Sequence, residues 1–166
     1  FYTAKANPSE GLLGEATDLR SALTFVCREP KIDTSRILLV GKSLGSVVSY
    51  RVFRADREVM GAVLLTPIAL PAEPGKYYPD LAAETRPMLF TVGANDPDNC
   101  PLDAFHRLLA SAGAQIAAQV FPGDHSFTLR QDDSLEAEKE NSANRATVVK
   151  GVVSMVRQWL AASRRK

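Results

Sequence analysis

Residues 37–48 of this chain read Ile-Leu-Leu-Val-Gly-Lys-Ser-Leu-Gly-Ser-Val-Val, and these twelve residues are the most informative about the fold. The short apolar run from Arg36 to Val40 is rich in branched residues, which is typical of a strand buried on both faces, and we expect Gly41 to close it. A helical rhythm of apolar residues follows over residues 45–57. Ser43 therefore stands on a turn between a strand and a helix, inside a Gly-x-Ser-x-Gly motif.

The turn restricts the size of the residues on either side of Ser43. A serine on such a tight turn takes strained backbone angles, and the residues two positions away on either side must be small so that strand and helix can pass closely. Gly41 and Gly45 are the small residues at these two positions. The turn also places the backbone N–H of Leu44 at a helix N-terminus, where the helix dipole and unpaired donors favour a developing oxyanion. The motif in this setting indicates that Ser43 is a nucleophile.

Helices and strands alternate on both sides of this motif. We expect further helices over residues 11–29, 102–112 and 149–160, and further strands over residues 61–65, 88–92 and 115–121. This alternation is the signature of an α/β protein, a three-layer α/β/α sandwich with a mostly parallel sheet. We expect a single domain over residues 1–166. Residues 66–87 are broken by prolines and predict a surface loop, and residues 130–146 predict a solvated loop or helix face.

A nucleophilic serine needs a base, because its hydroxyl is scarcely ionised at neutral pH, and imidazole is the usual choice. The chain has two histidines. His106 lies in a helical stretch, and we expect an ordinary exposed helix residue there. His125 lies in a turn just past the fourth strand, and ligands of open α/β sheets collect at the carboxyl ends of strands. His125 is therefore the candidate base.

The base in turn needs an acid that fixes its tautomer. Asp96 follows the third strand and precedes Pro97, which biases it to an extended geometry close to the strand. Asp98 is the reserve candidate, and both residues could simply form a turn. Ser43, Asp96 and His125 nevertheless fall in the order Ser, Asp, His, each directly after a separate strand, as the α/β-hydrolase arrangement requires.

Composition excludes several other classes of function. Twenty Lys and Arg residues against nineteen Asp and Glu leave a net charge of +1, so no strong field is available to attract nucleic acid or an anionic membrane. The sequence has neither an apolar run of about 18 residues nor the layout of a signal peptide. Cys27 and Cys100 lack metal-type spacing, so we expect no disulfide, no metal and a reducing, cytoplasmic compartment.

The sequence resembles the α/β-hydrolase superfamily over nearly its whole length. The most specific pieces are residues 41–46, 93–96 and 123–127. Within the superfamily it is similar to the small lidless members, the dienelactone-hydrolase-like proteins and the Tex-type branch, in which a basic residue occupies the position of Lys42. The resemblance implies Ser43 as nucleophile, His125 as general base, Asp96 as orienting acid and the Leu44 N–H as one oxyanion donor, with no cofactor.

Two departures from the resemblance affect what is expected here. Dienelactone hydrolases proper use a cysteine nucleophile, whereas position 43 is serine, so their particular substrate is not carried over. The superfamily also takes its other oxyanion donor from a loop after an earlier strand, and about four strands of an eight-stranded member would lie upstream. We therefore expect this chain to be the carboxyl-terminal part of a domain of roughly 200 to 250 residues, with residues 37–40 lacking one neighbouring strand.

The expected activity is hydrolysis of an ester or thioester of a small-molecule acyl substrate through an acyl-enzyme. The short connection over residues 66–87 predicts an open, shallow pocket, which Tyr77 and Tyr78 would border unless they cover the edge of the core. A peptidase of the prolyl-oligopeptidase kind is an enzymatic alternative. A non-catalytic scaffold that binds a protein partner is the alternative from another class, because fold does not fix function. The sequence leaves the substrate and the oligomeric state open.

Overall fold

The computed structural model describes residues 8–69, 77–113 and 115–163, and four parallel strands form its sheet in the order β1-β2-β3-β4. The elements in chain order are α1 (Pro8–Val26), η1 (Thr34–Arg36), β1 (Leu38–Lys42), α2 (Leu44–Ala55), β2 (Gly61–Leu65), η2 (Leu81–Ala83), β3 (Met88–Gly93), α4 (Leu102–Ala110), β4 (Ile116–Phe121) and α5 (Leu135–Ser163). This alternation confirms the predicted α/β class, and strand and helix ends differ from the predicted ones by a few residues.

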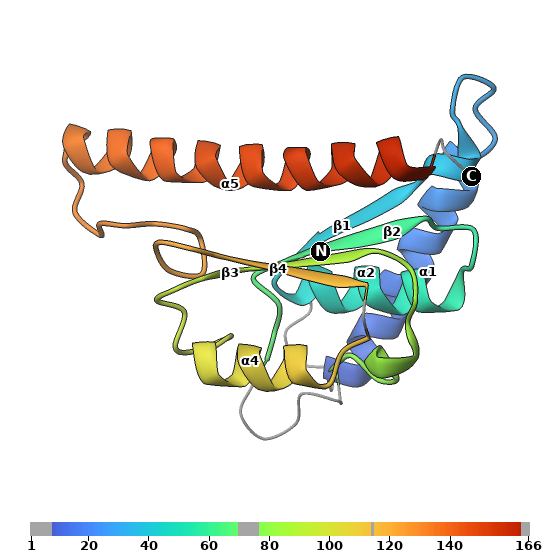
Figure 1. Cartoon of the computed structure of the whole chain (residues 1–166), viewed down its shortest axis with the longest axis horizontal. Helices are drawn as coiled ribbons and strands as arrows, with labels where there is room; N and C mark the ends of the chain where they lie inside the picture. The colour runs from blue at the N-terminus through green and yellow to red at the C-terminus, as the bar shows by residue number, and fades with distance from the viewer. Residues whose placement is uncertain (1–7, 70–76, 114, 164–166) are drawn as a thin grey trace.

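Helices cover both faces of the sheet (Figure 1). The main core lies between the sheet and helices α1, α2 and α4, and its fully buried side chains include Tyr50, Phe53, Leu64, Tyr78, Met88, Phe90, Phe105 and Leu108. Strand residues that alternate with these, such as Val63 and Leu89, face the side of α5 and are also fully buried. The arrangement is the predicted three-layer sandwich.

β1 corrects one prediction, because it is not buried on both faces. Leu39 is buried, but Val40, on the opposite face, is 59% exposed. Gly41 also does not close the strand, which continues through Lys42 and pairs in register with β2 from Leu38↔Gly61 to Lys42↔Leu65. Within the described residues β1 pairs with β2 alone, so it forms an edge of the sheet, as expected for a strand without a second neighbour.

Several apolar residues of the helices and strands are exposed. Val26, the last residue of α1, is one of them. In β4 the apolar Val120 is exposed, while Gln119 is half-buried against Gly151 of α5. In α5, Val149 and Val153 are exposed, while Val152, Val156 and Trp159 are half-buried. The buried side of α5 begins earlier, at Ala137.

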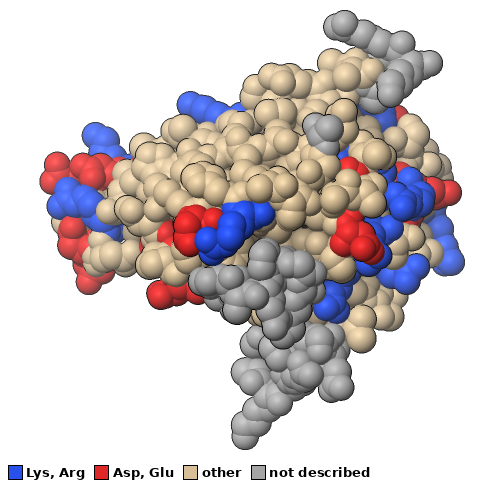
Figure 2. Space-filling view, turned by 60° about the horizontal axis from the view of Figure 1, so that its bottom comes forward, with Lys and Arg blue, Asp and Glu red and all other residues tan. Residues whose placement is uncertain are grey.

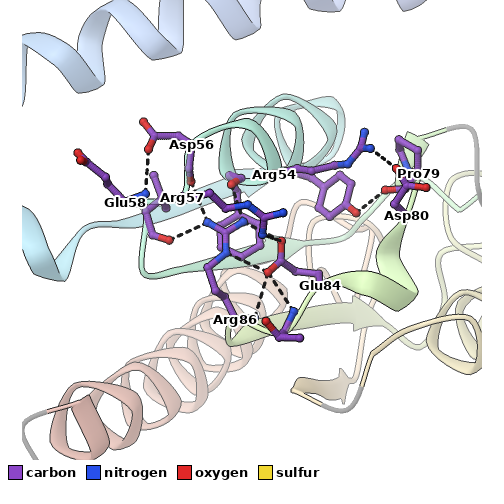
Figure 3. A network of polar contacts seen from close by, with 12 residues as sticks. Arg54, Asp56, Arg57, Glu58, Pro79, Asp80, Glu84 and Arg86 are labelled. Carbon is purple, nitrogen blue, oxygen red and sulfur yellow. Dashed lines mark hydrogen bonds and ion pairs between the residues drawn. The ribbon is translucent and has the colours of Figure 1, made fainter. Parts of the chain in front are cut away.

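A buried ion pair ties the start of β3 to the end of α2 (Figure 3). The Arg86 guanidinium donates to both carboxylate oxygens of Glu84, at 2.9 and 2.7 Å. It also donates to the carbonyl oxygens of Phe53, Asp56 and Val59, at 2.7 to 3.0 Å, and lies 3.7 Å from the centre of the Phe53 ring. One side chain thereby satisfies carbonyls at the α2 C-terminus that have no partner within the helix.

Charged side chains on the surface are interspersed by sign. Figure 2 shows Lys and Arg beside Asp and Glu at both ends of one face and in a small cluster between them, within a largely uncharged surface. Near the start of α5, Arg130 pairs with Asp132, Glu136 and Glu140. None of the described helices is long and apolar enough to cross a bilayer.

Candidate active site

At the carboxyl edge of the sheet, the segments that follow β1, β2 and β3 each donate a backbone hydrogen bond to the neighbouring strand or to the loop after it. Ser43 N–H donates to Leu65 O at 3.0 Å, and Thr66 N–H donates to Thr91 O at 2.7 Å. Beyond β3, Asn95 N–H donates to Gly123 O at 2.8 Å. The segments that carry Ser43, Asp96 and His125 therefore lie along one edge, in the order of their strands.

Ser43 occupies the strained turn that the motif predicts. Its φ of 56° and ψ of −127° are rarely adopted by a residue with a side chain. A Cβ at Gly41 would lie 2.1 Å from Gly45 O and 2.6 Å from Ser49 Oγ, so this position admits only glycine. Beyond its own helix and chain neighbours, a Cβ at Gly45 would meet no atom of the described residues within 4 Å, and the expectation that Gly45 must be small for close packing is wrong.

Leu44 is the first residue of α2. Its N–H has no acceptor within its own helix, because the first N–H groups of an α-helix lack a carbonyl one turn before them. The positive end of the helix dipole lies at the same place. The structure thus puts an N–H donor directly after Ser43, where an anion formed at that side chain could be bound.

Asp96 and His125 are in direct contact. Asp96 Oδ2 lies 2.5 Å from His125 Nδ1, and Asp96 Oδ1 accepts a hydrogen bond from Asn99 Nδ2 at 3.1 Å. The Asp96 side chain is 2% exposed and that of His125 24%, so the carboxylate is buried and the imidazole is reached from solvent. Asp98 is exposed and makes no contact with His125 among the described residues.

The Ser43 hydroxyl makes no hydrogen bond to His125 in the part of the chain that the structure describes. Contacts of this kind are often long in proteins without substrate and shorten when the substrate binds. The structure therefore brings Asp96 and His125 together and places Ser43 on the same edge of the sheet.

The loop that carries His125 is a tight turn closed by Asp124. The Asp124 carboxylate accepts hydrogen bonds from the backbone N–H groups of Ser126 and Thr128 and from the Gln131 side chain. Burial by itself would raise the pKa of the Asp124 carboxyl, but these hydrogen bonds outweigh it and hold that pKa below its ordinary value. Asp124 is therefore an ionised cap of the turn.

Two residues of this loop adopt positive φ. Gly123 has a φ of 100° and Phe127 a φ of 58°. A Cβ at Gly93, the last residue of β3, would lie 2.1 Å from Asp124 O, so only glycine lets the loop approach β3 this closely. The position of His125 thus depends on close backbone packing as well as on its contact with Asp96.

Three polar residues of α5 hold this loop from the other side. Asn144 Nδ2 donates to Pro122 O at 2.7 Å and to Phe127 O at 2.9 Å, which bridges the two ends of the turn. Asn141 Oδ1 accepts from the N–H groups of residues 129 and 130, at 2.7 and 3.2 Å. Arg145 donates to Ser126 O and to Thr128 Oγ1.

These residues fall in the segment 130–146, for which a solvated loop or helix face was predicted, and that prediction is wrong for the buried Asn141 and Asn144. A signal for them exists in the sequence. Ala137, Asn141, Asn144 and Val148 stand four, three and four residues apart and share the buried face of α5. Asparagines inside such a stripe mark buried polar contacts, because buried amides need hydrogen-bond partners.

The remaining sequence candidates lie elsewhere. His106 is exposed in α4, as predicted. Tyr78 is buried in the core and does not border an open pocket, while Tyr77 packs against the core from a half-buried position. Among the described residues no group of three or more His, Cys, Asp or Glu side chains is arranged to hold a metal ion.

The fold and the site together define the class of protein. A parallel sheet between two helical layers, with a serine on a strained strand–helix turn and an Asp–His pair after later strands, is the α/β-hydrolase fold. The model of the dienelactone hydrolase family matches residues 10–158, and the chain belongs to that family.

Solved structures with this fold include enzymes and one homologue of an enzyme. A carboxylesterase from Mesorhizobium loti is 20% identical with a TM-score of 0.56, and the match covers 92% of this chain and 62% of that one. A putative dienelactone hydrolase from Klebsiella pneumoniae is 21% identical with a TM-score of 0.59, covering 87% of this chain and 62% of that one. An alpha-beta serine hydrolase homologue from Coxiella burnetii is 21% identical with a TM-score of 0.59, covering 75% and 53%.

The chain thus spans between about half and three-fifths of the length of these structures. A search of curated protein sequences returned no significant match.

Proposed function

We propose that this protein is a serine hydrolase that cleaves an ester or thioester of a small-molecule acyl substrate. The observation that carries the proposal is the contact between the buried Asp96 carboxylate and His125, at the same sheet edge as Ser43 on its strained turn. Membership of the dienelactone hydrolase family supports hydrolase chemistry in general. Ser43 stands at the nucleophile position, so the chemistry proposed is that of a hydroxyl nucleophile.

Each residue has one role in the proposed reaction. His125 carries its proton on Nδ1 and donates a hydrogen bond from there to the Asp96 carboxylate, and this leaves Nε2 free to take the proton of Ser43 Oγ. Ser43 Oγ attacks the acyl carbon, and the Leu44 N–H stabilises the oxyanion. His125 then gives the proton to the leaving alcohol or thiol, and a water molecule activated by the same imidazole releases the acid.

The geometry favours Asp96 over Asp98 as the acid. Asp96 is held on one oxygen by Asn99 and presents the other to His125, so its orientation is fixed before the imidazole becomes charged. A buried carboxylate stabilises the imidazolium more than an exposed one, because water screens it less. Asp98 is exposed, and it makes no hydrogen bond to His125 among the described residues.

A fluorophosphonate probe tests the nucleophile. We expect the purified protein to be labelled and Ser43→Ala to remain unlabelled, with Ser142→Ala, at an exposed serine of α5, as the matched control that still reacts. A folded protein that is not labelled would exclude the hydrolase proposal and favour the non-catalytic scaffold.

Matched aspartate variants test the acid. We expect Asp96→Asn to lower kcat on a nitrophenyl ester by about 10³- to 10⁴-fold, because the imidazole loses its tautomer and its partner. Asp98→Asn, two residues away and exposed, keeps kcat within about twofold of the unsubstituted protein. The reverse pattern would assign the acid to Asp98.

A further inference from the structure

A chain of buried hydrogen bonds runs from the connection after β2 to the carbonyl of Ser43. The Ile68 N–H donates to the Tyr78 hydroxyl at 3.1 Å, and that hydroxyl lies 2.7 Å from Ser46 Oγ. Ser46 Oγ donates to Ser43 O at 2.6 Å. Ser46 and Tyr78 are both buried, so water does not compete for these contacts.

The number of hydroxyl hydrogens determines which group donates and which accepts in each of these hydrogen bonds. Ser46 has one hydroxyl hydrogen and uses it on the Ser43 carbonyl, while the Tyr78 oxygen accepts from Ile68. The Tyr78 proton therefore points to Ser46 Oγ. Burial raises the pKa of Tyr78 well above its ordinary value, so the hydroxyl keeps this proton throughout the pH range of an enzyme assay.

The acceptor at the end of the chain belongs to the peptide group that bears the Leu44 N–H. The carbonyl of Ser43 and the N–H of Leu44 share one planar unit and point in opposite directions, so holding the oxygen also aims the N–H. The backbone N–H of Ser46 donates to the same oxygen at 2.9 Å. Because the φ and ψ of Ser43 lie in a sparsely populated region, the surrounding contacts must hold this peptide in place.

Tyr78 is itself rigidly placed. Its ring packs edge-on against Tyr50, with centroids 5.4 Å apart, and against Phe90, with centroids 5.8 Å apart. The Tyr50 hydroxyl donates to Pro79 O at 2.6 Å, which anchors the backbone next to Tyr78. The chain of hydrogen bonds thus starts from a fixed point in the core.

We propose that Tyr78 and Ser46 are positioning residues that aim the Leu44 N–H at the oxyanion formed on attack by Ser43. This inference rests on the proposed hydrolase function, and it assigns to the connection between β2 and β3 a part in transition-state stabilisation. The two side chains act through the peptide group and do not touch the substrate.

Kinetics of three variants and one control test the proposal. Tyr78→Phe, Ser46→Ala and the double variant are compared on a nitrophenyl ester with Thr91→Val, which removes a buried hydroxyl of β3 that makes no hydrogen bond among the described residues. We expect kcat to fall about tenfold in each single variant with KM within about twofold, since outright loss of an oxyanion donor costs about 10²- to 10³-fold. The double variant is no slower than the slower single one, because both substitutions break the same series of hydrogen bonds. Thr91→Val stays within about twofold.

A readout independent of turnover separates this inference from the proposed function. The amide signal of Leu44 in ¹⁵N-correlated NMR spectra is expected to move in Tyr78→Phe and Ser46→Ala, and to stay in place in Thr91→Val. Thermal unfolding identifies the variants that remain folded. If Leu44 does not respond in folded Tyr78→Phe, or if Thr91→Val loses as much activity, the inference is wrong.

The two proposals fail in different ways. Absence of fluorophosphonate labelling in the unsubstituted protein excludes the hydrolase proposal and, with it, the positioning role of Tyr78 and Ser46. Normal labelling together with unchanged kcat in Tyr78→Phe and Ser46→Ala removes only the positioning role.

Discussion

Replacement of Arg86 by alanine is expected to destabilise the fold far more than replacement of Arg57, although both arginines face the same carboxylate (Figure 3). The Arg86 side chain is 16% exposed and forms a two-pronged contact with Glu84, whose own side chain is 3% exposed. The Arg57 side chain is 71% exposed and lies 3.7 Å from the same residue. The pair of variants therefore compares a buried and an exposed ion pair on one acceptor.

The expected magnitudes follow from burial. Arg86→Ala leaves the Glu84 charge buried without its main partner, which costs about 3 to 5 kcal/mol. It also removes the donors to the carbonyls of Phe53, Asp56 and Val59, and that loss lies within the same range because the effects are not additive. Arg57→Ala removes an exposed pair and is expected to cost less than about 1 kcal/mol.

The assay is equilibrium unfolding in urea at pH 7 and at about pH 3.5. Burial by itself would raise the pKa of Glu84, but the hydrogen bonds and charge of Arg86 outweigh it and hold the pKa below its usual value. The unfolded chain therefore binds a proton on Glu84 at higher pH than the folded protein does, and the stability from this pair is lost as pH falls below about 4. The difference between the unsubstituted protein and Arg86→Ala is expected to shrink in acid.

Equal free energies of unfolding for Arg86→Ala and Arg57→Ala would refute the reasoning, and so would a difference between the unsubstituted protein and Arg86→Ala that is the same at both pH values. In the first case the exposed arginine would hold the carboxylate as well as the buried one. In the second case the cost would come from lost packing alone.

Two further predictions concern the site. Gly41→Ala is expected to leave little folded protein in a thermal melt, because its Cβ would overlap Gly45 O, whereas the Cβ of Gly45→Ala would contact no other described segment and the melting temperature stays within a few degrees. Similar melting temperatures for both variants would show that the contact between β1 and α2 is looser than this. Asn144→Ala is expected to lower the free energy of unfolding in urea by about 2 kcal/mol and kcat about tenfold, because two carbonyls of the His125 loop lose their hydrogen-bond donor. Ser142→Ala, at an exposed position of the same helix, is the control, and an unchanged kcat in Asn144→Ala would show that the loop holds His125 without α5.

Local sequence patterns predicted the elements whose environment is uniform. Residues 61–65 form β2 with the predicted bounds, because a strand with neighbours on both sides and helices over both faces is apolar throughout. The turn at Ser43 and the contact of Asp96 with His125 followed from motif order and from the geometry of parallel strands. These features depend on residues close together in sequence or on the general rule that loops gather at one sheet edge.

Other features depend on which distant segment lies opposite a residue, and no local pattern states that. Val40 has the composition of a buried strand residue, but nothing in the described structure covers it, so its exposure could not be predicted from residues 36–40. Gly45 looked sterically required because Gly41 is, yet only Gly41 faces the helix backbone. The abundant charges around Asn141 and Asn144 suggested solvent, and they concealed the buried stripe on the other side of the same helix.

The clamp that α5 forms on the His125 loop has a consequence for synthesis of the chain. Ser43, Asp96 and His125 are made in that order, and Asn141, Asn144 and Arg145, which contact the loop that carries His125, are made after all three. A nascent chain that already contains Ser43, Asp96 and His125 still lacks the helix that orients the imidazole. In the proposed reaction His125 is therefore oriented only once α5 has been synthesised and has docked, so activity would report that this helix is in place.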